Sequence, residues 1–172
     1  MKSKIKIIPI TAALEFADQP LEWSIKLWGE GKEEFSADDW RKFYKNAIKS
    51  DYNNWDLLGV DQEHLFMAIR DKDQESEVVA SIAICDFDDF EEFRPYKPWI
   101  AAFIVREDLR GNGIGSQVLK LAEEKAVAYG IGKIYLWTEG EREFYGKRGY
   151  QFLKQMNKPG RKIDLMCKEL IK

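Results

Sequence analysis

The sequence predicts one α/β domain with a mixed β-sheet. The chain has 172 residues, of which 45% are hydrophobic and 33% charged, a size and composition typical of one soluble domain with a sizeable core. Short apolar runs alternate with segments of helical periodicity over the whole length. Because no linker, repeat or low-complexity segment interrupts this pattern, we expect residues 1–172 to form a single domain.

Charge and hydropathy exclude several kinds of partner. The net charge is −3, so the basic character typical of nucleic-acid-binding proteins is missing. No apolar run approaches the roughly 20 residues that span a bilayer. The N-terminus is basic, but the apolar region of a signal peptide does not follow it. We therefore expect a cytoplasmic protein that binds neither nucleic acid nor membranes.

The cysteines and the single histidine favour structural roles. Cys85 and Cys167 lie in apolar, strand-like contexts, which favours small core residues over a disulfide or a nucleophile. His64 is the only histidine, so a histidine-based triad or a multi-histidine metal site is nearly excluded. We expect His64 to be structural or exposed.

The first third of the chain predicts one strand and several helices. Polar and apolar residues alternate over residues 4–10, which is typical of a strand. Thr11 can cap a helix that begins near Ala12, and Pro20 is expected to interrupt it before a second helical piece over residues 21–29. Ser36 and Asp39 have the spacing of a capping box, which predicts a helix over residues 38–49.

The middle of the chain predicts a hairpin and a strand–helix–strand unit. Two apolar runs separated by a polar turn indicate the hairpin, at residues 64–70 and 78–86 with the turn at 71–77. Residues 99–105 are apolar throughout and are expected to lie in the centre of the sheet. A helix from Gly113 to about Gly130 then leads to a strand over residues 133–138, a crossover that should be right-handed.

The C-terminal region predicts a short helix and a second hairpin. The helix covers residues 141–148, and Gly149 stands where a left-handed cap is needed. Two strands follow over residues 150–156 and 162–170, joined by a turn at Pro159 and Gly160.

Three glycines mark a site for an anion at the start of the helix after residues 99–105. Gly111, Gly113 and Gly115 let the backbone turn sharply without a Cβ in the way. The helix that follows begins with free N–H groups and the positive end of its dipole. Together these features predict a phosphate-binding site.

Two familiar nucleotide loops match this segment poorly. A P-loop needs Gly-x-x-x-x-Gly-Lys-Ser/Thr, and no such string occurs. A dinucleotide-binding loop needs a third glycine where Ser116 stands, although Glu139 is in a place to act as the ribose ligand. The loop at residues 106–110 is also long and charged. A nucleotide-binding oxidoreductase therefore remains only as an alternative.

Two motifs in a fixed order carry a resemblance to a known superfamily. Arg110-Gly-Asn-Gly-Ile-Gly115 resembles Arg/Gln-x-x-Gly-x-Gly/Ala, the pyrophosphate loop of the GNAT superfamily of N-acetyltransferases. Phe144-Tyr-Gly-Lys-Arg-Gly-Tyr150 is similar to the second GNAT signature, Phe/Leu-Tyr-x-x-x-Gly-Phe/Tyr. The resemblance implies a mainly antiparallel mixed sheet, flanked by helices, with a splayed parallel pair of central strands.

The resemblance also implies acetyl-coenzyme A as the ligand and assigns the residues that bind it. Backbone N–H groups of the loop would hold the pyrophosphate, and the end of the preceding strand would pair with the pantetheine arm and polarise the thioester. An asparagine often found after the second strand of the pair is absent, which leaves the contacts at the thiol end open. The implied binding residues are Phe103, Ile104, Val105, Arg110, Gly111, Asn112, Gly113, Ile114, Gly115, Ser116, Thr138 and Tyr145.

For catalysis, the resemblance places Tyr145 where a tyrosine of many members protonates the departing thiolate. A carboxylate that accepts the proton of the amine is useful, because amines are mostly protonated at neutral pH. Glu139 is our choice, with Glu92 and Asp86 as alternatives. The acidic stretch at residues 86–92 either attracts a cationic amine or is a solvated loop.

The N-terminal aromatic residues form either an acceptor wall or part of the core: Trp23, Trp28, Trp40, Phe43, Tyr44, Tyr52 and Trp55.

Our hypothesis is an N-acetyltransferase that passes an acetyl group directly from acetyl-CoA to a primary amine, without a metal. A non-catalytic acyl-CoA sensor on the same fold is the alternative. The acceptor, a small molecule or a protein amine, and the existence of a homodimer stay open.

Overall fold

The computed structural model describes residues 4–29 and 35–171. A seven-stranded sheet with the order β1-β2-β3-β4-β5-β7-β6 forms its centre, and only β4 and β5 are parallel. The mainly antiparallel sheet confirms the predicted fold class and is not the parallel sheet of a dinucleotide-binding fold. The strands are β1 (Ile5–Pro9), β2 (Glu63–Lys72), β3 (Glu75–Cys85), β4 (Trp99–Val105), β5 (Lys133–Thr138), β6 (Gln151–Lys158) and β7 (Arg161–Glu169).

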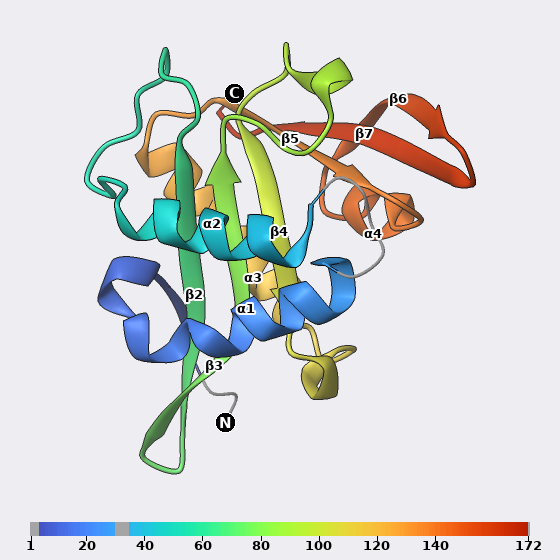
Figure 1. Ribbon diagram of the computed structural model, residues 1–172. Helices are drawn as coiled ribbons and strands as arrows, with labels where there is room; N and C mark the ends of the chain where they lie inside the picture. The colour runs from blue at the N-terminus through green and yellow to red at the C-terminus, as the bar shows by residue number, and fades with distance from the viewer. Residues whose placement is uncertain (1–3, 30–34, 172) are drawn as a thin grey trace.

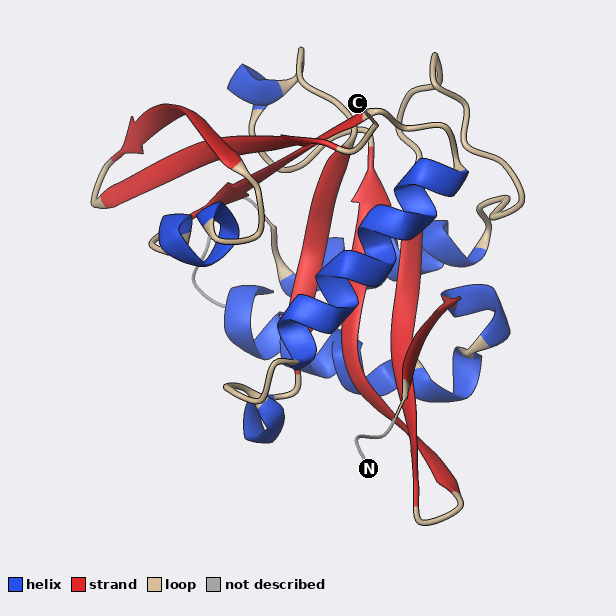
Figure 2. Ribbon diagram, turned by 180° about the vertical axis from the view of Figure 1, so that it is seen from behind, coloured by secondary structure: helices blue, strands red, loops and turns tan. Residues whose placement is uncertain are grey.

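Helices cover both faces of the sheet. Figure 1 shows α1 (Asp18–Ser24) and α2 (Ala37–Ile48) in front of β2, β3 and β4. Figure 2, seen from behind, shows α3 (Ile114–Ala128) crossing the opposite face. The short helix α4 (Arg142–Gly146) lies beside the β6–β7 hairpin, which extends away from the rest of the sheet (Figure 1). Among the described helices, none is long and apolar enough to cross a membrane.

The segment before α1 corrects one prediction. Two 3₁₀ turns, Ile10–Ala12 and Leu14–Phe16, occupy the place of the expected first helix. Pro20 lies inside the first turn of α1 instead of interrupting a helix. Proline is tolerated there because the N–H groups of the first turn have no partner within the helix. The π-helical turn Ile25–Gly29 then continues α1.

The capping box and the first hairpin form largely as predicted. Ser36 Oγ accepts a hydrogen bond from the Asp39 N–H, and the Asp39 carboxylate accepts one from the Ser36 N–H, so both motif residues fix the start of α2. The turn between β2 and β3 is shorter than expected. It consists of Asp73 and Gln74, whose φ angles of 52° and 70° suit a tight hairpin turn.

The core lies between the sheet and the helices on each face. Helix α3 buries Val118, Leu119, Ala122 and Ala126 at helical spacing against the sheet. Cys85 and Cys167 are buried and free, as predicted. His64 is buried with its Nδ1 3.0 Å from the Tyr129 hydroxyl, and burial lowers its pKa to about 4. The histidine is therefore a neutral core residue, which agrees with the structural role expected for it.

Candidate active site

The parallel strands β4 and β5 meet at one end and then separate. Trp99 on β4 is paired with Tyr135 on β5, and no later residue of β4 is paired with β5. Beyond this bridge, the backbone edge of β4 that faces β5 has no strand partner on β5. A buried edge of this kind needs polar partners, and an extended ligand with amide groups can supply them. This opening is the splayed strand pair that the resemblance implied.

A bulge in β4 changes the direction of the backbone inside this opening. Ser81 and Ala83 on β3 pair with Ile104 and Ala101, so two residues of β4 stand opposite one residue of β3. One of the two is Ala102, whose φ of 49° is unusual for a residue with a side chain. Such strained positions recur at functional sites. The bulge offers backbone N–H groups at a place where an oxyanion could be stabilised.

The glycine loop lies between the end of β4 and the start of α3. Gly111 and Gly113 have φ angles of 83° and 80°, and Gly113 is the N-cap of α3. Nothing lies within 4 Å of a Cβ built on either glycine, so the backbone angle is what requires glycine. The first turn of α3 then presents N–H groups and a positive dipole end, as an anion site needs.

Side chains of the loop hold its shape. Arg110 Nε donates a 3.0 Å hydrogen bond to the Val105 carbonyl, and Asn112 Nδ2 donates one of 3.0 Å to the Leu109 carbonyl. The arginine therefore ties the loop to the end of β4. The resemblance implied that Arg110 binds the pyrophosphate. In the structure its side chain supports the loop backbone that would contact an anion.

The two sequence motifs touch each other. A Cβ on Gly115 would lie 3.6 Å from Phe103 and 3.8 Å from Phe144, so the helix start packs closely against β4 and α4. Arg148 Nε donates a 2.7 Å hydrogen bond to Ser116 Oγ, and its guanidinium lies over the Phe144 ring. The second motif thus supports the glycine loop as well as positioning Tyr145.

Tyr145 lies on α4 and lines a cavity that continues from the strand opening. Its ring packs edge-on against Phe144 and Tyr150, with centroids 5.0 and 5.8 Å away. Burial, with a smaller contribution from Glu141, raises the pKa of Tyr145 to about 12. The phenol is therefore protonated at neutral pH and available as a proton donor.

Thr138 and Glu139 mark the end of β5. Thr138 Oγ1 accepts a hydrogen bond from the Glu141 N–H and so helps to turn the chain toward α4. Glu139 lines the cavity and forms an ion pair with Arg161 of β7. One of its oxygens is engaged by the guanidinium, and its side chain is 30% exposed. Glu139 is the one carboxylate among the three predicted bases that reaches the cavity.

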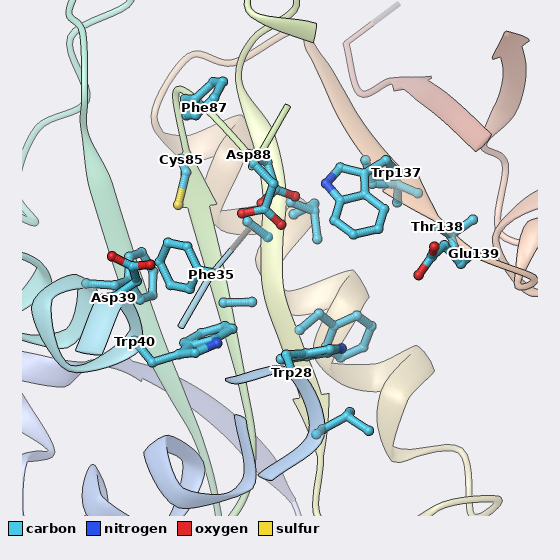
Figure 3. Close-up of a pocket in the computed structure, with 18 of the residues that line it drawn as sticks. Trp28, Phe35, Asp39, Trp40, Cys85, Phe87, Asp88, Trp137, Thr138 and Glu139 are labelled. Carbon is cyan, nitrogen blue, oxygen red and sulfur yellow. The ribbon is translucent and has the colours of Figure 1, made fainter. Parts of the chain in front are cut away.

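The cavity itself has a volume of about 710 Å³ and lies over the middle of β4 (Figure 3). Such a volume is typical of small-molecule sites. Its walls come from distant parts of the chain, since the π-helical turn Ile25–Gly29, α2 and the loop after β3 contribute together with β4, β5 and α4. The aromatic lining residues are Trp28, Phe35, Trp40, Phe43, Phe87, Phe103, Trp137 and Tyr145.

The comparisons with known proteins agree with this geometry. The Acetyltransferase (GNAT) family matches residues 29–150, well over half of the chain. This protein belongs to the GNAT acetyltransferase family. A comparison with functionally curated proteins gave no match.

Solved structures of GNAT proteins share the fold at low identity. A GNAT acetyltransferase from Staphylococcus aureus Mu50 is 17% identical, with a TM-score of 0.63 over 97% of this chain and 99% of that one. A GNAT acetyltransferase from Elizabethkingia anophelis with acetyl-CoA bound is 17% identical, with a TM-score of 0.58 over 98% and 99%. An aminoglycoside 6'-N-acetyltransferase complexed with coenzyme A is 16% identical, with a TM-score of 0.63 over 90% and 91%.

Two carboxylates that the sequence did not single out also line the cavity of this GNAT protein. Asp88 follows β3, and burial, together with the charge of Asp89, raises its pKa well above the usual range. Glu63 begins β2, and burial raises its pKa to about 7. Glu63 Oε2 is buried without a hydrogen-bond partner. Glu63 is the first residue of β2 and belongs to no motif, so only the folded sheet reveals its place.

The two other predicted bases lie outside the cavity lining. The Asp86 carboxylate accepts hydrogen bonds from the Gln62 N–H and from Gln62 Nε2, at 2.9 and 3.0 Å, and so holds the end of β3 to the start of β2. Glu92 is paired with Lys158 at 3.0 Å on the β6–β7 hairpin. The acidic stretch therefore divides, with Asp88 and Asp89 at the cavity and Asp86 and Glu92 in structural contacts.

The predicted aromatic wall divides in the same way. Trp28, Trp40 and Phe43 line the cavity, and Trp28 stacks on Trp40 with ring centroids 5.4 Å apart. The other predicted wall residues do not line the cavity; Tyr44, Tyr52 and Trp55 are in the core, and Trp23 packs against it.

Proposed function

We propose that this protein is an acetyl-CoA-dependent N-acetyltransferase that passes an acetyl group directly to a primary amine. The observation that carries the proposal is the continuity of one site. The glycine loop, the free edge of β4 and the bulge at Ala102 lie on one side, and the cavity continues on the other. A donor bound along β4 would therefore present its thioester to an acceptor in the cavity.

Backbone groups would hold the donor. The N–H groups of residues 111–116 would face an anion at the start of α3, which suits a pyrophosphate, whereas the Arg110 N–H donates to the Glu107 carbonyl. The free edge of β4 at residues 103–105 suits the amides of the pantetheine arm. At the bulge, a backbone N–H would stabilise the negative charge that develops on the thioester oxygen.

Two side chains would move protons. The amine nitrogen attacks the carbonyl carbon, the C–N bond forms and the C–S bond breaks. Tyr145 donates its phenolic proton to the departing sulfur, where negative charge develops as the C–S bond breaks. Glu139 accepts the proton from the amine nitrogen, directly or through a water. Exchange with solvent then removes the proton from Glu139 and returns a proton to Tyr145.

Calorimetry and a thiol-release assay test this proposal. We expect coenzyme A to bind and acetyl-CoA to release free thiol only when an amine is present. Glu139→Gln should lower kcat by about tenfold to a thousandfold for every accepted amine. Binding of coenzyme A without thiol release on a broad panel of amines would instead indicate an acyl-CoA-binding domain. Failure of coenzyme A to bind at millimolar concentration would end the proposal.

A further inference from the structure

The cavity is strongly acidic on its acceptor side. Its described lining includes six acidic residues and one cation, Arg161, which is paired with Glu139. The Asp39 carboxylate is engaged by Ser36 in the capping box. The six acidic residues are Asp39, Glu63, Asp88, Asp89, Glu139 and Glu141. Acidic residues therefore outnumber cations in the described lining.

Glu63 and Asp88 both lie near Cys85, at the end of β3. Glu63 pairs directly with Cys85 across β2 and β3, so their side chains share a face of the sheet. Asp88 comes three residues after Cys85, and the charges of both Glu63 and Asp88 act on the Cys85 thiol. No salt bridge joins either carboxylate to a cation in the described part of the chain. Ionising carboxyl groups held in this way is costly unless a ligand supplies the counter-ion.

Aromatic rings close the space around these carboxylates. Figure 3 shows Trp28 and Trp40 below Asp88, and Trp137 beside it with its indole nitrogen turned toward the carboxylate. Trp40 is 6% exposed, and its Nε1 has no hydrogen-bond partner although the residue lines the cavity. Indole faces attract ammonium groups, most strongly where water is excluded. The unpartnered N–H of Trp40 is one further donor that is available to a ligand.

We propose that the acceptor is a diamine, whose second ammonium group binds between Glu63 and Asp88 while the first is acetylated at the β4 bulge. This inference rests on the proposed function, because it names the substrate class of the same site. The carboxylates contribute the counter-charge, and the aromatic rings enclose the alkyl chain and the ammonium group.

The strand register gives the length of such an acceptor. Ala101, next to the bulge, pairs with Ala83, and Cys85 is two residues further along β3. Two residues along a strand and one strand spacing across give a separation of about 8 Å between the bulge and the position of Cys85. An extended alkyl chain of a short diamine such as cadaverine spans a distance of this order. A monoamine of the same length would leave the carboxylates without a cation.

Matched acceptors provide the test. Thiol release from acetyl-CoA is measured with cadaverine, n-pentylamine and aminopentanol, which share a five-carbon chain and differ only in the terminal group. We expect kcat/KM for cadaverine to exceed that for the other two by about tenfold to a hundredfold. The preference should arise mainly in KM, because the second ammonium group takes no part in the chemical step.

Variants locate the preference. Glu63→Gln and Asp88→Asn should each reduce the ratio of kcat/KM for cadaverine to that for n-pentylamine by about fivefold or more, with the affinity for coenzyme A retained. Glu92→Gln, a change in the same acidic stretch but paired with Lys158 outside the cavity, is the control and should keep the ratio. Thermal unfolding of each variant confirms that it is folded.

The outcomes separate the two proposals. Equal kcat/KM values for the three acceptors, with coenzyme A bound and thiol released, would overturn the diamine inference and leave the proposed function standing. An unchanged ratio in both Glu63→Gln and Asp88→Asn would also overturn it. Failure to bind coenzyme A would overturn the proposed function, and the diamine inference with it.

Discussion

The donor side and the acceptor side of the site are built from different parts of the chain. On the donor side, the groups offered to a ligand are mainly backbone groups. They belong to β4, the glycine loop and the first turn of α3, which follow one another over residues 99–116. On the acceptor side, side chains from the turn Ile25–Gly29, α2, β2, the loop after β3 and β5 meet only in the folded protein. A backbone site depends on conformation, and a side-chain site depends on charge and burial.

The two sides also differ in how completely their polar groups are satisfied. Arg110, Asn112 and Arg148 all form hydrogen bonds that support the donor loop. Glu63 Oε2 and the Trp40 indole nitrogen have no hydrogen-bond partner among the described residues. The donor loop is thus held in place by its own hydrogen bonds, whereas the acceptor side has polar groups that are available to a ligand. Substitutions should therefore affect the two sides through different measurable quantities.

The largest effect is expected for Tyr145→Phe, at the junction of the two sides. Loss of the phenolic proton should lower kcat by about a hundredfold or more, while the affinity for coenzyme A changes little. Because the pKa of Tyr145 is raised to about 12, the wild-type rate should not fall from ionisation of this tyrosine between pH 6 and about 10. Steady-state kinetics over this pH range and calorimetry with coenzyme A measure the two quantities.

Tyr150→Phe is the matched control for that change. The Tyr150 hydroxyl donates to Glu123 at 2.9 Å and does not line the cavity. We expect its kcat to stay close to that of the wild type. An equal loss of rate in both variants, or a parallel loss of affinity for coenzyme A in Tyr145→Phe, would assign Tyr145 to packing.

A second, smaller effect tests the backbone character of the donor side. Gly113 has a φ of 80°, which valine adopts only at a cost of about 1–3 kcal/mol. Gly113→Val should therefore weaken coenzyme A about tenfold to a hundredfold as the N–H groups of the loop lose their alignment. The dissociation constant from calorimetry is the measurement.

Gly115→Ala serves as the comparison within the same loop. Its added Cβ would lie 3.6 Å from Phe103 Cζ and 3.7 Å from Val105 Cγ2, which are ordinary contacts. The affinity for coenzyme A should stay within about threefold of the wild type. Similar losses in both glycine variants would show that space, and not backbone conformation, limits the donor side.

The same contrast explains what the sequence could predict. The glycines and the apolar strand are local signals, because a turn with positive φ needs glycine and a buried strand needs apolar residues. The fold class, the capping box at Ser36 and Asp39, and the splay of β4 from β5 were therefore predictable from motifs. The boundaries of the first hairpin turn were less so, since Asp73 and Gln74 adopt positive φ without glycine.

The sequence could not predict which carboxylates line the acceptor side. Glu63 and Asp88 are separated by twenty-four intervening residues and meet only because β2 pairs with β3 in one register. A shift of one residue would turn Glu63 to the other face. Within the acidic stretch, nothing in the residue types separates Asp88, at the cavity, from Asp86, which holds Gln62. The sequence shows that this stretch is acidic, but tertiary contacts determine which of its carboxylates face the cavity.

The smallest expected effect, on stability, tests whether the acceptor side holds an uncompensated charge. Burial raises the pKa of Glu63 from 4.5 to about 7, so the folded state binds more protons than the unfolded state between these values. The free energy of unfolding should therefore decrease as the pH rises from 4.5 to 7 through this group. Glu63→Gln removes the cost of ionising this buried carboxyl. It should therefore raise the free energy of unfolding at pH 8 by about 1–2 kcal/mol, a value reduced because Glu63 is partly exposed.

Thermal unfolding at two pH values measures this effect. Glu63→Gln should raise Tm at pH 8 by about 3–6 °C and change it little at pH 5, where the wild-type carboxyl is mostly protonated. Glu92→Gln, which removes a surface pair with Lys158, should not raise Tm at either pH. Adding cadaverine at pH 8 should raise the Tm of the wild type toward that of Glu63→Gln, because a cation beside Glu63 restores the stability that its isolated charge removes. This result would link the stability effect to diamine binding. A wild-type Tm higher than that of Glu63→Gln at pH 8 without ligand would mean that the carboxylate is already compensated within the fold.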